Sequence, residues 1–395
     1  MRKIQNLAVG LTLALIAATP SAVPSTDLVY FGSAPPAGRP GPGGRPPQVN
    51  PHAPPNSIYA ARFDEMTGQL TSLGQVTKLD RPTWIVANPE QPIIYSVNEL
   101  GNFGAVQGQV VAYKVNPSNG GLAEINRVEA GGGGTTNLFL DQASQTIFTA
   151  NYGTGQVSAV PIKPDGSLGA LTSVVQDYGS GPSPRQQGPH AHAVGLDPSH
   201  QWLFVPDLGA DRMFEYHFND ATRTLTPANP PYHQFAPGTG PRHVAFSADG
   251  RFIYMESELT AKVYVFALDA KTGKVSEVQQ VSGVPAGFTG ETSGAEIAVS
   301  RDGRFVYTSN RGDDTLEAYA RKQSSGKLTE IQRLPAQGKN PWSFAIDPSA
   351  HWLLVTDQAS NEVVVLKINP RTGTLSASGM SMPCLSPVSA TFWVQ

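Results

Sequence analysis

The sequence predicts an all-β fold, a seven-bladed β-propeller, and two features of the chain support this prediction. First, a short run of strand-forming residues ends in an aromatic or aliphatic residue that is followed three positions later by a small polar residue. The seven pairs are Tyr30/Ser33, Tyr95/Asn98, Phe148/Asn151, Phe204/Asp207, Tyr254/Ser257, Tyr307/Asn310 and Leu354/Asp357. Second, successive pairs are 65, 53, 56, 50, 53 and 47 residues apart. A repeat of about 50 residues built from strands is typical of a propeller with one four-stranded blade per repeat.

Asp-Gly pairs mark the connection between the first two strands of a blade. Asp249-Gly250 lies between the strand-like residues 244–246 and 252–254, and residues 297–307 repeat this order around Asp302-Gly303. An Asp-Gly pair between two such runs is a strong hairpin signal. The repeats therefore predict antiparallel blades.

The two ends of the chain complement each other. Residues 28–30 match the second strand of a repeat, and residues 387–393 match the first strand. We therefore expect the C-terminal strand to complete the blade that the N-terminal residues begin, which closes the ring and removes its open edges. The prediction is one propeller domain over residues 26–395.

The first 25 residues have the features of a secretory signal. Arg2 and Lys3 precede an apolar stretch, residues 7–18, and small residues follow it. This order is typical of a cleavable signal peptide, and the apolar stretch is short for a membrane anchor. We expect residues 1–25 to be a signal peptide and the protein to be periplasmic or secreted. The alternative is a buried N-terminal helix.

Residues 33–56 are rich in proline and glycine and interrupt the first blade. This composition cannot bury a core, so it predicts an insertion loop, either a tolerated surface insertion or a lid over one face.

Cys384 is the single cysteine of the chain, so an exported form would contain no internal disulfide.

Composition and missing motifs exclude several classes of function. The formal net charge is −3 and the chain has no basic run, which argues against a nucleic-acid partner. There is no Gly-Lys-Ser/Thr phosphate loop, no His-Glu-x-x-His and no Gly-x-Ser-x-Gly elbow. We expect a monomer without a membrane span, a cofactor or a metal, whose partner is a small molecule.

Chemically active residues occur at the ends of strands that should meet at one end of the central channel. His190 and His192 precede the first strand of one repeat, and Arg242 has the same position in the next. Glu258 and Arg311 each follow the small polar residue after a second strand. Because equivalent loops of a propeller surround one channel, we expect these side chains to converge.

Such a cluster suits the attack of water on an ester. A carboxylate or an imidazole, Glu258 or His190, would take the proton from water. The guanidinium groups of Arg242 and Arg311 would hold a substrate carboxylate and stabilise the developing oxyanion. These residues are the catalytic candidates.

Residues in equivalent loops are the candidates for substrate binding: His192, His243, Glu99, Asn151 and Asn310. Asn98, Asn151 and Asn310 have an alternative role as turn residues that bond their own backbone. The spacing of His190 and His192 on one face of a strand leaves a metal site as another alternative, although the sequence shows no third ligand.

Several motifs together resemble a known family. They are Pro189-His190-Ala191-His192, Gly240-Pro241-Arg242-His243, Glu258-Leu259, Ala295-Glu296-Ile297 with Asp302-Gly303-Arg304, and Ser309-Asn310-Arg311-Gly312. They look like the lactonase family of seven-bladed propellers, which includes the bacterial propeller-type 6-phosphogluconolactonase and the fungal carboxy-cis,cis-muconate cyclase. The resemblance covers about residues 27–393 apart from the proline-rich insertion. It implies that His190, Arg242, Glu258 and Arg311 are catalytic.

Two positions depart from the family pattern. Ser257 stands where relatives often have asparagine, and Trp342 stands where they often have arginine, which removes one anion contact and argues against a phosphorylated substrate. The sequence thus predicts an exported, 6-phosphogluconolactonase-like hydrolase that opens a sugar-acid or related lactone by water attack. The alternatives are a muconate-type lactonizing cyclase and a non-catalytic extracytoplasmic binding propeller.

Overall fold

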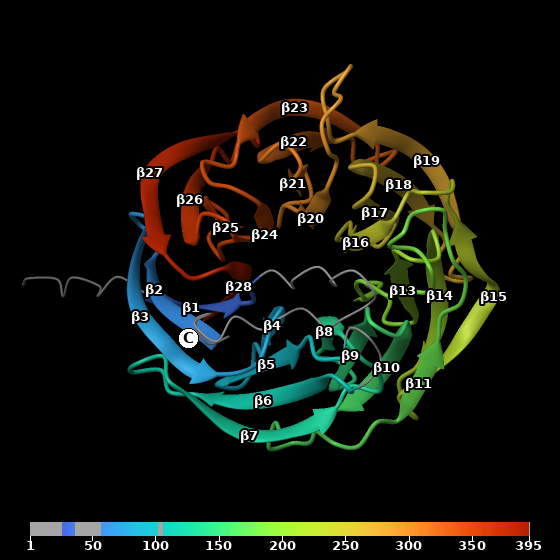
Figure 1. Cartoon of the computed structure of the whole chain (residues 1–395), viewed down its shortest axis with the longest axis horizontal. Helices are drawn as coiled ribbons and strands as arrows, with labels where there is room; N and C mark the ends of the chain where they lie inside the picture. Colours follow the sequence, from blue (N-terminus) through green and yellow to red (C-terminus); the bar gives the residue numbers. More distant parts are fainter. Residues whose placement is uncertain (1–25, 36–56, 102–105, 395) are drawn as a thin grey trace, which may run out of the picture.

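In a computed structural model, which describes residues 26–35, 57–101 and 106–394, the chain forms a seven-bladed β-propeller. Among these residues, 28 strands form seven four-stranded antiparallel sheets around a central axis (Figure 1). The predicted fold class is confirmed. The predicted signal peptide, residues 1–25, and residues 36–56 of the predicted insertion lie outside the described residues. In the part of the chain that is described, no helix has the length and apolar character needed to cross a membrane.

The sheets are called blades 1 to 7 here, and their strands are given from the channel outward. Blade 1 contains β28 (Pro387–Trp393), β1 (Thr26–Ser33), β2 (Ser57–Asp64) and β3 (Gln69–Lys78). Blade 2 contains β4 (Trp84–Ala87), β5 (Ile93–Asn98), β6 (Gln109–Val115) and β7 (Leu122–Glu129). Blade 3 contains β8 (Thr135–Asp141), β9 (Thr146–Asn151), β10 (Gln156–Pro161) and β11 (Ser173–Gln176). Blades 4 and 5 are β12 (Gly195–Leu196), β13 (Trp202–Asp207), β14 (Arg212–Asn219), β15 (Thr224–Gln234); and β16 (Pro241–Phe246), β17 (Phe252–Ser257), β18 (Lys262–Leu268), β19 (Val275–Ser282). Blades 6 and 7 are β20 (Gly294–Val299), β21 (Phe305–Asn310), β22 (Thr315–Arg321), β23 (Leu328–Pro335); and β24 (Pro341–Ile346), β25 (Trp352–Asp357), β26 (Glu362–Ile368), β27 (Leu375–Pro383).

The C-terminal strand closes the ring, as the sequence predicts. β28 is the innermost strand of blade 1 and pairs antiparallel with β1, with Leu28 opposite Trp393. β1 pairs on its other side with β2, and Ser33 is opposite Ser57. Strand pairing therefore extends to both borders of the predicted insertion, and Ser33 belongs to β1 rather than to a loop.

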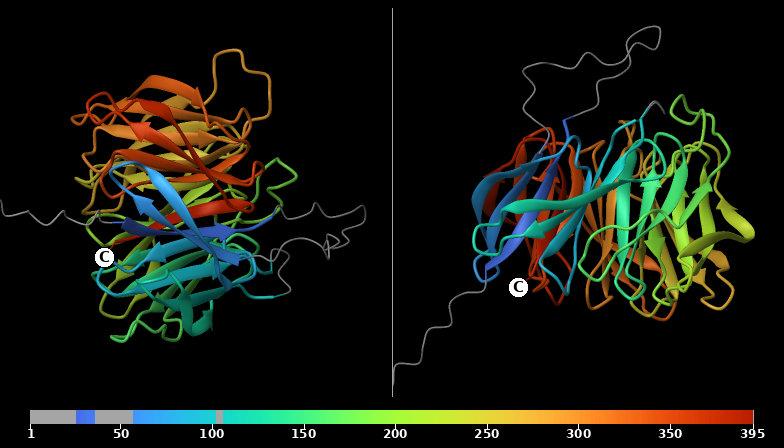
Figure 2. Two further views of the ribbon diagram at one scale, coloured as in Figure 1. Left: turned by 90° about the vertical axis from the view of Figure 1, so that its left-hand side faces the viewer. Right: turned by 90° about the horizontal axis from the view of Figure 1, so that it is seen from below.

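The disc has two different faces, which are seen edge-on in Figure 2. The loop face contains the connections between blades and those between second and third strands, including residues 177–194, 235–240, 258–261 and 283–293. The turn face contains the turns between first and second and between third and fourth strands, including residues 247–251, 269–274, 300–304 and 322–327.

On the turn face, a hydrogen bond joins each blade to the next. The tyrosines of the repeat pattern donate their hydroxyls to turn carbonyls of the following blade at 3.0–3.1 Å: Tyr30 to Gly120, Tyr95 to Gly166, Tyr254 to Gly326 and Tyr307 to Gly373. In blades 4 and 7, where Phe and Leu replace the tyrosine, the indole N–H of Trp202 or Trp352 donates instead. Between blades 3 and 4, Arg223 donates to the carbonyl of Ser144. Across the described residues, all seven junctions therefore carry such a bond.

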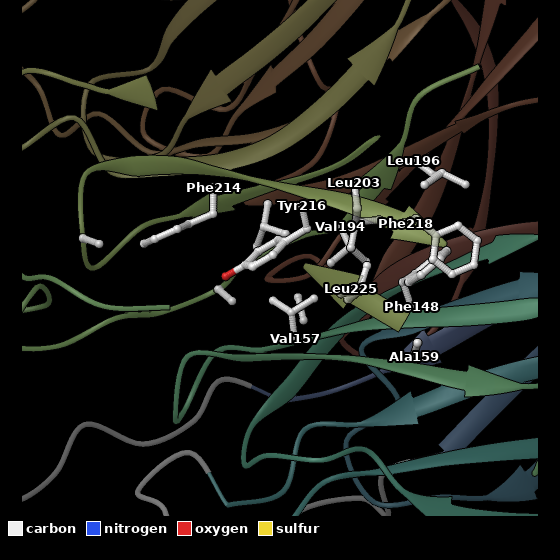
Figure 3. Packing of buried hydrophobic residues seen from close by; sticks show 14 residues of the cluster. Phe148, Val157, Ala159, Val194, Leu196, Leu203, Phe214, Tyr216, Phe218 and Leu225 are labelled. Carbon is white, nitrogen blue, oxygen red and sulfur yellow. The ribbon is translucent and has the colours of Figure 1, made fainter. Parts of the chain in front are cut away.

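Apolar side chains fill the spaces between blades. Between blades 3 and 4, Phe148, Leu203, Phe214 and Tyr216 are buried in one cluster (Figure 3). The rings of Phe148 and Phe218 pack edge to face with their centroids 4.8 Å apart. These close-packed interfaces fix the relative positions of the blades, and hence of the loops that they carry.

Candidate active site

The candidate site lies on the loop face around the channel, where blades 4, 5 and 6 adjoin. Arg242 is part of β16, Glu258 directly follows β17, and Arg311 directly follows β21. His192 precedes β12, the innermost strand of blade 4. The structure brings these side chains together, as their positions in the repeats suggested.

A β-bulge directs Arg242 out of the regular strand alternation. The pairing of β16 with β17 skips Arg242. In blade 7, the pairing of β24 with β25 skips Trp342 in the same way. A bulge re-aims one side chain and is often found beside a functional site. The two side chains lie close together, since the Arg242 guanidinium is 5.9 Å from the centre of the Trp342 ring.

Glu258 is the centre of a buried ion-pair cluster. Its Oε2 accepts a hydrogen bond from Nε of Arg242 at 3.2 Å, and its Oε1 lies 3.1 Å from Nη2 of Arg311. Oε1 also accepts a bond from Arg185. Burial would raise the pKa of Glu258, but the positive charges of Arg311, Arg185 and Arg242 outweigh it and hold this pKa well below its ordinary value. Glu258 is therefore an ionised carboxylate that orders the guanidinium groups around it.

The two inner arginines differ in how fully they are bonded. Arg242 donates to Glu258 and to the carbonyl of Ala295, and burial, reinforced by Arg311, lowers its pKa to about 10. Arg311 donates to the carbonyl of Gly294 at 3.3 Å and lies 4.5 Å above the Trp342 ring. Its Nε is buried without a hydrogen-bond partner among the described residues. Nε of Arg242, in contrast, is bonded to Glu258.

Two neutral histidines pack against this cluster. Nε2 of His192 lies 3.6 Å from Oε2 of Glu258, which is too long for a hydrogen bond. Burial, with repulsion from Arg242, lowers the pKa of His192 well below its ordinary value. His243 contacts Glu296 through Nδ1 at 3.0 Å, and burial lowers its pKa as well. Neither imidazole adds a positive charge near neutral pH.

His190 lies at the edge of the cluster. Its Nδ1 is 2.6 Å from the carbonyl oxygen of Tyr152, and its ring is stacked on the Tyr152 ring with centroids 4.6 Å apart. A carbonyl oxygen can only accept, so Nδ1 carries the proton and Nε2 carries the lone pair. Burial lowers the pKa of His190, which keeps the ring neutral and able to accept a proton.

Arg185 is a site residue that the sequence analysis did not select. One of its nitrogens binds Glu258, and Nη2 lies 3.2 Å from the Tyr152 hydroxyl. Its side chain is 48% exposed, so it faces incoming ligands more openly than Arg242 or Arg311. It comes from the connection between β11 and β12, the longest connection between blades among the described residues. Its position beside a proline- and serine-rich stretch is the signal that the sequence offers.

Three other predicted substrate-binding residues have hydrogen bonds or ion pairs of their own. Asn151 is buried and donates to two backbone carbonyls, and Asn310 is buried and accepts from two backbone N–H groups. These contacts match the alternative role of turn residues. Glu99 lies in the β5–β6 connection of blade 2, where it pairs with Arg81. The contacts of Asn151 and Asn310 are thus with backbone groups, and Glu99 contacts Arg81.

The fold and the cluster define a class of protein, a seven-bladed propeller with a buried cluster of charged residues and histidines on one face. The family model described as "Lactonase, 7-bladed beta-propeller" matches residues 51–392. The chain belongs to this family, which confirms the resemblance inferred from its motifs.

Similar proteins extend over most of the chain. The 6-phosphogluconolactonase of Bacillus subtilis is 33% identical over 328 residues, which cover 82% of this chain and 92% of the relative. A 6-phosphogluconolactonase of Formosa agariphila is 28% identical, with coverage of 82% and 91%. The solved structure of the periplasmic gluconolactonase of Pseudomonas aeruginosa is 32% identical, covers 94% of this chain and 99% of that chain, and has a TM-score of 0.83.

Proposed function

We propose that this protein opens a cyclic ester by attack of water. The observation that carries the proposal is the Glu258 cluster, in which a buried carboxylate fixes guanidinium groups beside neutral imidazoles. Fixed positive charge stabilises a developing oxyanion, and a neutral imidazole accepts a proton near neutral pH. Its place in the lactonase family makes the chain an enzyme of the carboxylic ester hydrolase class.

In this proposal, His190 rather than Glu258 takes the proton from water. An efficient general base has a pKa near the operating pH, whereas the arginines hold the pKa of Glu258 far below that range. His190 is oriented by Tyr152 so that Nε2 is the unprotonated nitrogen. As the tetrahedral intermediate breaks down, the imidazolium returns the proton to the ring oxygen of the lactone. The product is an open hydroxy acid, and His190 is neutral again.

The other site residues bind and stabilise. Arg311, which has an unpaired Nε among the described contacts, and the half-exposed Arg185 hold the carbonyl oxygen as it becomes negative. Arg242 and Glu258 keep these guanidinium groups in place. The buried Nδ1 of His192 has no hydrogen-bond partner among the described residues and is available to a substrate hydroxyl.

The proposed substrate is a sugar-acid lactone without a phosphate group. The Pseudomonas aeruginosa relative is named a gluconolactonase, and the Bacillus subtilis relative a 6-phosphogluconolactonase. A phosphate would need positive charge of its own, yet Arg242 and Arg311 share Glu258 and border a neutral ring, Trp342. An unphosphorylated sugar ring, which has an apolar face and several hydroxyls, suits Trp342 and His192.

The proposal includes export. The basic head at Arg2 and Lys3 and the apolar residues 7–18 support a cleavable signal, and the Pseudomonas aeruginosa relative is named a periplasmic protein. N-terminal sequencing of protein from the periplasm or the medium should place the mature start near residue 25, at about the end of the signal. Intact Met1 on the cytosolic protein as its main form would contradict export.

Acid release in a pH-stat tests the activity directly. Mature protein is given δ-lactones of several aldonic acids and the 6-phosphorylated form of one of them. We expect turnover of an unphosphorylated lactone with kcat/KM about tenfold or more above that of its phosphorylated form. Absence of turnover for every lactone would refute the activity, and a preference for the phosphorylated form would refute the substrate assignment.

Two histidine variants test the role of His190. His190→Ala should lower kcat by about 10², the scale of a lost general base. The control is His351→Ala, because His351 is exposed on the turn face and contacts Ser349. Parent-like kcat in His190→Ala would remove His190 from the mechanism.

A further inference from the structure

Gln186 and Asp211 form a buried hydrogen-bonded pair on the loop face, beside the residue that contacts Glu258 from the β11–β12 connection. Gln186 directly follows that residue, Arg185, and Asp211 directly precedes β14. Both side chains are buried, and Nε2 of Gln186 donates to Oδ1 of Asp211 at 2.7 Å. The mechanism proposed above uses neither of them.

The Asp211 carboxylate accepts three hydrogen bonds. Besides the bond from Gln186, its Oδ1 accepts the N–H of Gly240 at 2.8 Å, and its Oδ2 accepts the N–H of Gly238 at 2.7 Å. Each partner is an N–H donor, so this position requires an acceptor oxygen on both arms of the side chain. A carboxylate meets the requirement, whereas the amide of an asparagine would direct an N–H group at one of the donors.

Gln186 uses both ends of its amide to hold the turn that contains Arg185. Its Nε2 also donates to the carbonyl of Leu208 at 2.8 Å, and its Oε1 accepts the N–H of Ser183 at 3.1 Å. The backbone N–H of Gln186 donates to the carbonyl of Ser183 at 2.8 Å. A Cβ atom on Gly181 would lie 2.6 Å from Oε1 of Gln186, so the surroundings are closely packed. The turn is thus fixed to the β13–β14 connection.

The same carboxylate connects this turn to Glu258. Asp211 holds the N–H of Gly240, and the carbonyl of Gly240 accepts the N–H of Glu258 at 2.7 Å. The guanidinium of Arg185 binds the carboxylate of Glu258. The two residues are therefore joined twice, once through their side chains and once through Gln186, Asp211 and Gly240. The second connection limits the positions available to the Arg185 side chain, which is half exposed and would otherwise be free to change rotamer.

We propose that Asp211 is a positioning residue that, through Gln186, holds Arg185 beside Glu258 where its guanidinium meets the substrate carbonyl. The inference rests on the proposed role of Arg185. Loss of the bond between Asp211 and Gln186 frees the turn without removing the guanidinium itself. The reactive arrangement of Arg185 is then less populated, so the loss is in kcat rather than in substrate binding.

Asp211→Asn tests the proposal with an almost unchanged side-chain volume. It should lower kcat by about tenfold and leave KM nearly unchanged. In an Arg185→Ala background, the same substitution should lower kcat by no more than about twofold, because the residue through which it acts is absent. Gln186→Glu breaks the same bond from the other side and should give the same pattern. Parent-like kcat in Asp211→Asn, or an equal loss with and without Arg185, would overturn the proposal.

Asp197→Asn is the matched control, because Asp197 is a buried carboxylate of the same blade on the turn face. It also accepts three N–H groups, those of Gln201 at 3.0 Å, Trp202 at 2.8 Å and Ser199 at 3.0 Å. Both substitutions should lower the Tm, but only Asp211→Asn should lower kcat. A similar loss of kcat in Asp197→Asn would mean that turnover reports general stability, and the inference would fall.

Amide hydrogen exchange tests the connection without lactone turnover. Because Gln186 ties residues 181–188 to Asp211, loss of the carboxylate should let this segment open more often. Its exchange should be about tenfold faster or more in Asp211→Asn than in the parent, and unchanged in Asp197→Asn. Unchanged exchange in Asp211→Asn would overturn the inference. If the parent opens no lactone, the proposed function fails by itself, while the exchange comparison still decides whether Asp211 holds the turn of Arg185.

Discussion

Both faces of the propeller contain ion pairs between an arginine and a carboxylate, but these pairs differ greatly in how far they are buried. On the loop face, Arg242 pairs with Glu258, and their side chains are 2% and 5% exposed. On the turn face, Arg251 pairs with Asp249, and their side chains are 54% and 39% exposed. An exposed pair contributes about 0–1 kcal/mol, whereas a buried pair carries a large desolvation cost. The pair with the large desolvation cost thus lies on the loop face, where the proposed reaction needs charges in fixed positions.

The faces also differ in regularity. The turn face repeats an inter-blade hydrogen bond around the ring, which at four of the seven described junctions comes from a tyrosine hydroxyl, for example from Tyr307 to Gly373. The loop face gathers its cluster from blades 4 to 6 and adds Tyr152, which directly follows β9, and Arg185, from the long connection between β11 and β12. Substitutions should therefore affect stability alone on the turn face, and turnover on the loop face.

Deletion of residues 387–395 should have the largest effect, because it damages both faces at once. It removes β28, the innermost strand of blade 1, and leaves β1 as an open edge beside a broken ring. We expect loss of cooperative unfolding in circular dichroism and an expanded or aggregated species in size exclusion. Truncation after Trp393 is the control and should fold like the parent. A cooperative transition of the 387–395 deletion at the parent Tm would contradict ring closure as a requirement.

Glu258→Gln should have the next largest effect and should be specific to the loop face. Glutamine cannot balance the guanidinium groups of Arg242 and Arg311, so turnover of a responsive lactone should fall by about 10² or more. Loss of one partner from a buried cluster should also lower the free energy of unfolding by about 3 kcal/mol, which a folded domain tolerates. Asp302→Asn, the loss of a carboxylate from the exposed pair with Arg304 on the turn face, should change neither quantity strongly. Similar effects of both substitutions would break the comparison between the faces.

The pH dependence of stability sharpens the same comparison. The folded pKa of Glu258 lies well below the ordinary value of 4.5, so its contribution is present above about pH 4.5 and is lost as the pH falls toward the folded pKa. The difference in unfolding free energy between the parent and Glu258→Gln should therefore shrink below about pH 4.5 in urea titrations. A difference that stays constant down to about pH 3 would show that Glu258 acts by packing rather than by charge.

The sequence predicted the fold because the repeated features have local physical causes. The Asp-Gly turns and the spacing of residues such as Tyr254 and Tyr307 set the blades, and the complementary ends set the ring closure. The positions of Glu258 and Arg311 followed from the same register, since each comes directly after a second strand.

The rest of the site depends on features that a repeat pattern does not contain. The bulge that skips Arg242 and the equivalent bulge at Trp342 become visible only when the strands are paired. Arg185 comes from a connection with its own path, so its contact with Glu258 could not be read from the register. Asn151 was predicted as a substrate ligand, yet a short polar side chain at a strand end also satisfies backbone groups, as it does here.

Tyr307→Phe should have a smaller effect, confined to stability. The substitution removes the hydroxyl that donates to Gly373 of blade 7 at 3.0 Å and keeps the buried ring. We expect the free energy of unfolding to fall by about 1 kcal/mol in urea titration, with lactone turnover unchanged. Phe148, the equivalent residue of blade 3, shows that the repeat accommodates phenylalanine at this position. Reduced kcat with unchanged stability would mean that the turn face acts on the site.

Arg304→Ala should have the smallest effect, because Arg304 lies on the turn face and half of its side chain is exposed. It pairs with Asp302 and donates to the carbonyl of Pro370 in the next blade. Salt and water screen such contacts, so the free energy of unfolding should change by no more than about 1 kcal/mol, and less at high ionic strength. Arg311→Ala, only seven positions further along the chain, removes an arginine of the Glu258 cluster and should lower lactone turnover by about 10². Both variants replace an arginine by alanine, but on different faces of the propeller. Equal lactone turnover in the two variants would show that the position of an arginine beside Glu258 does not determine turnover.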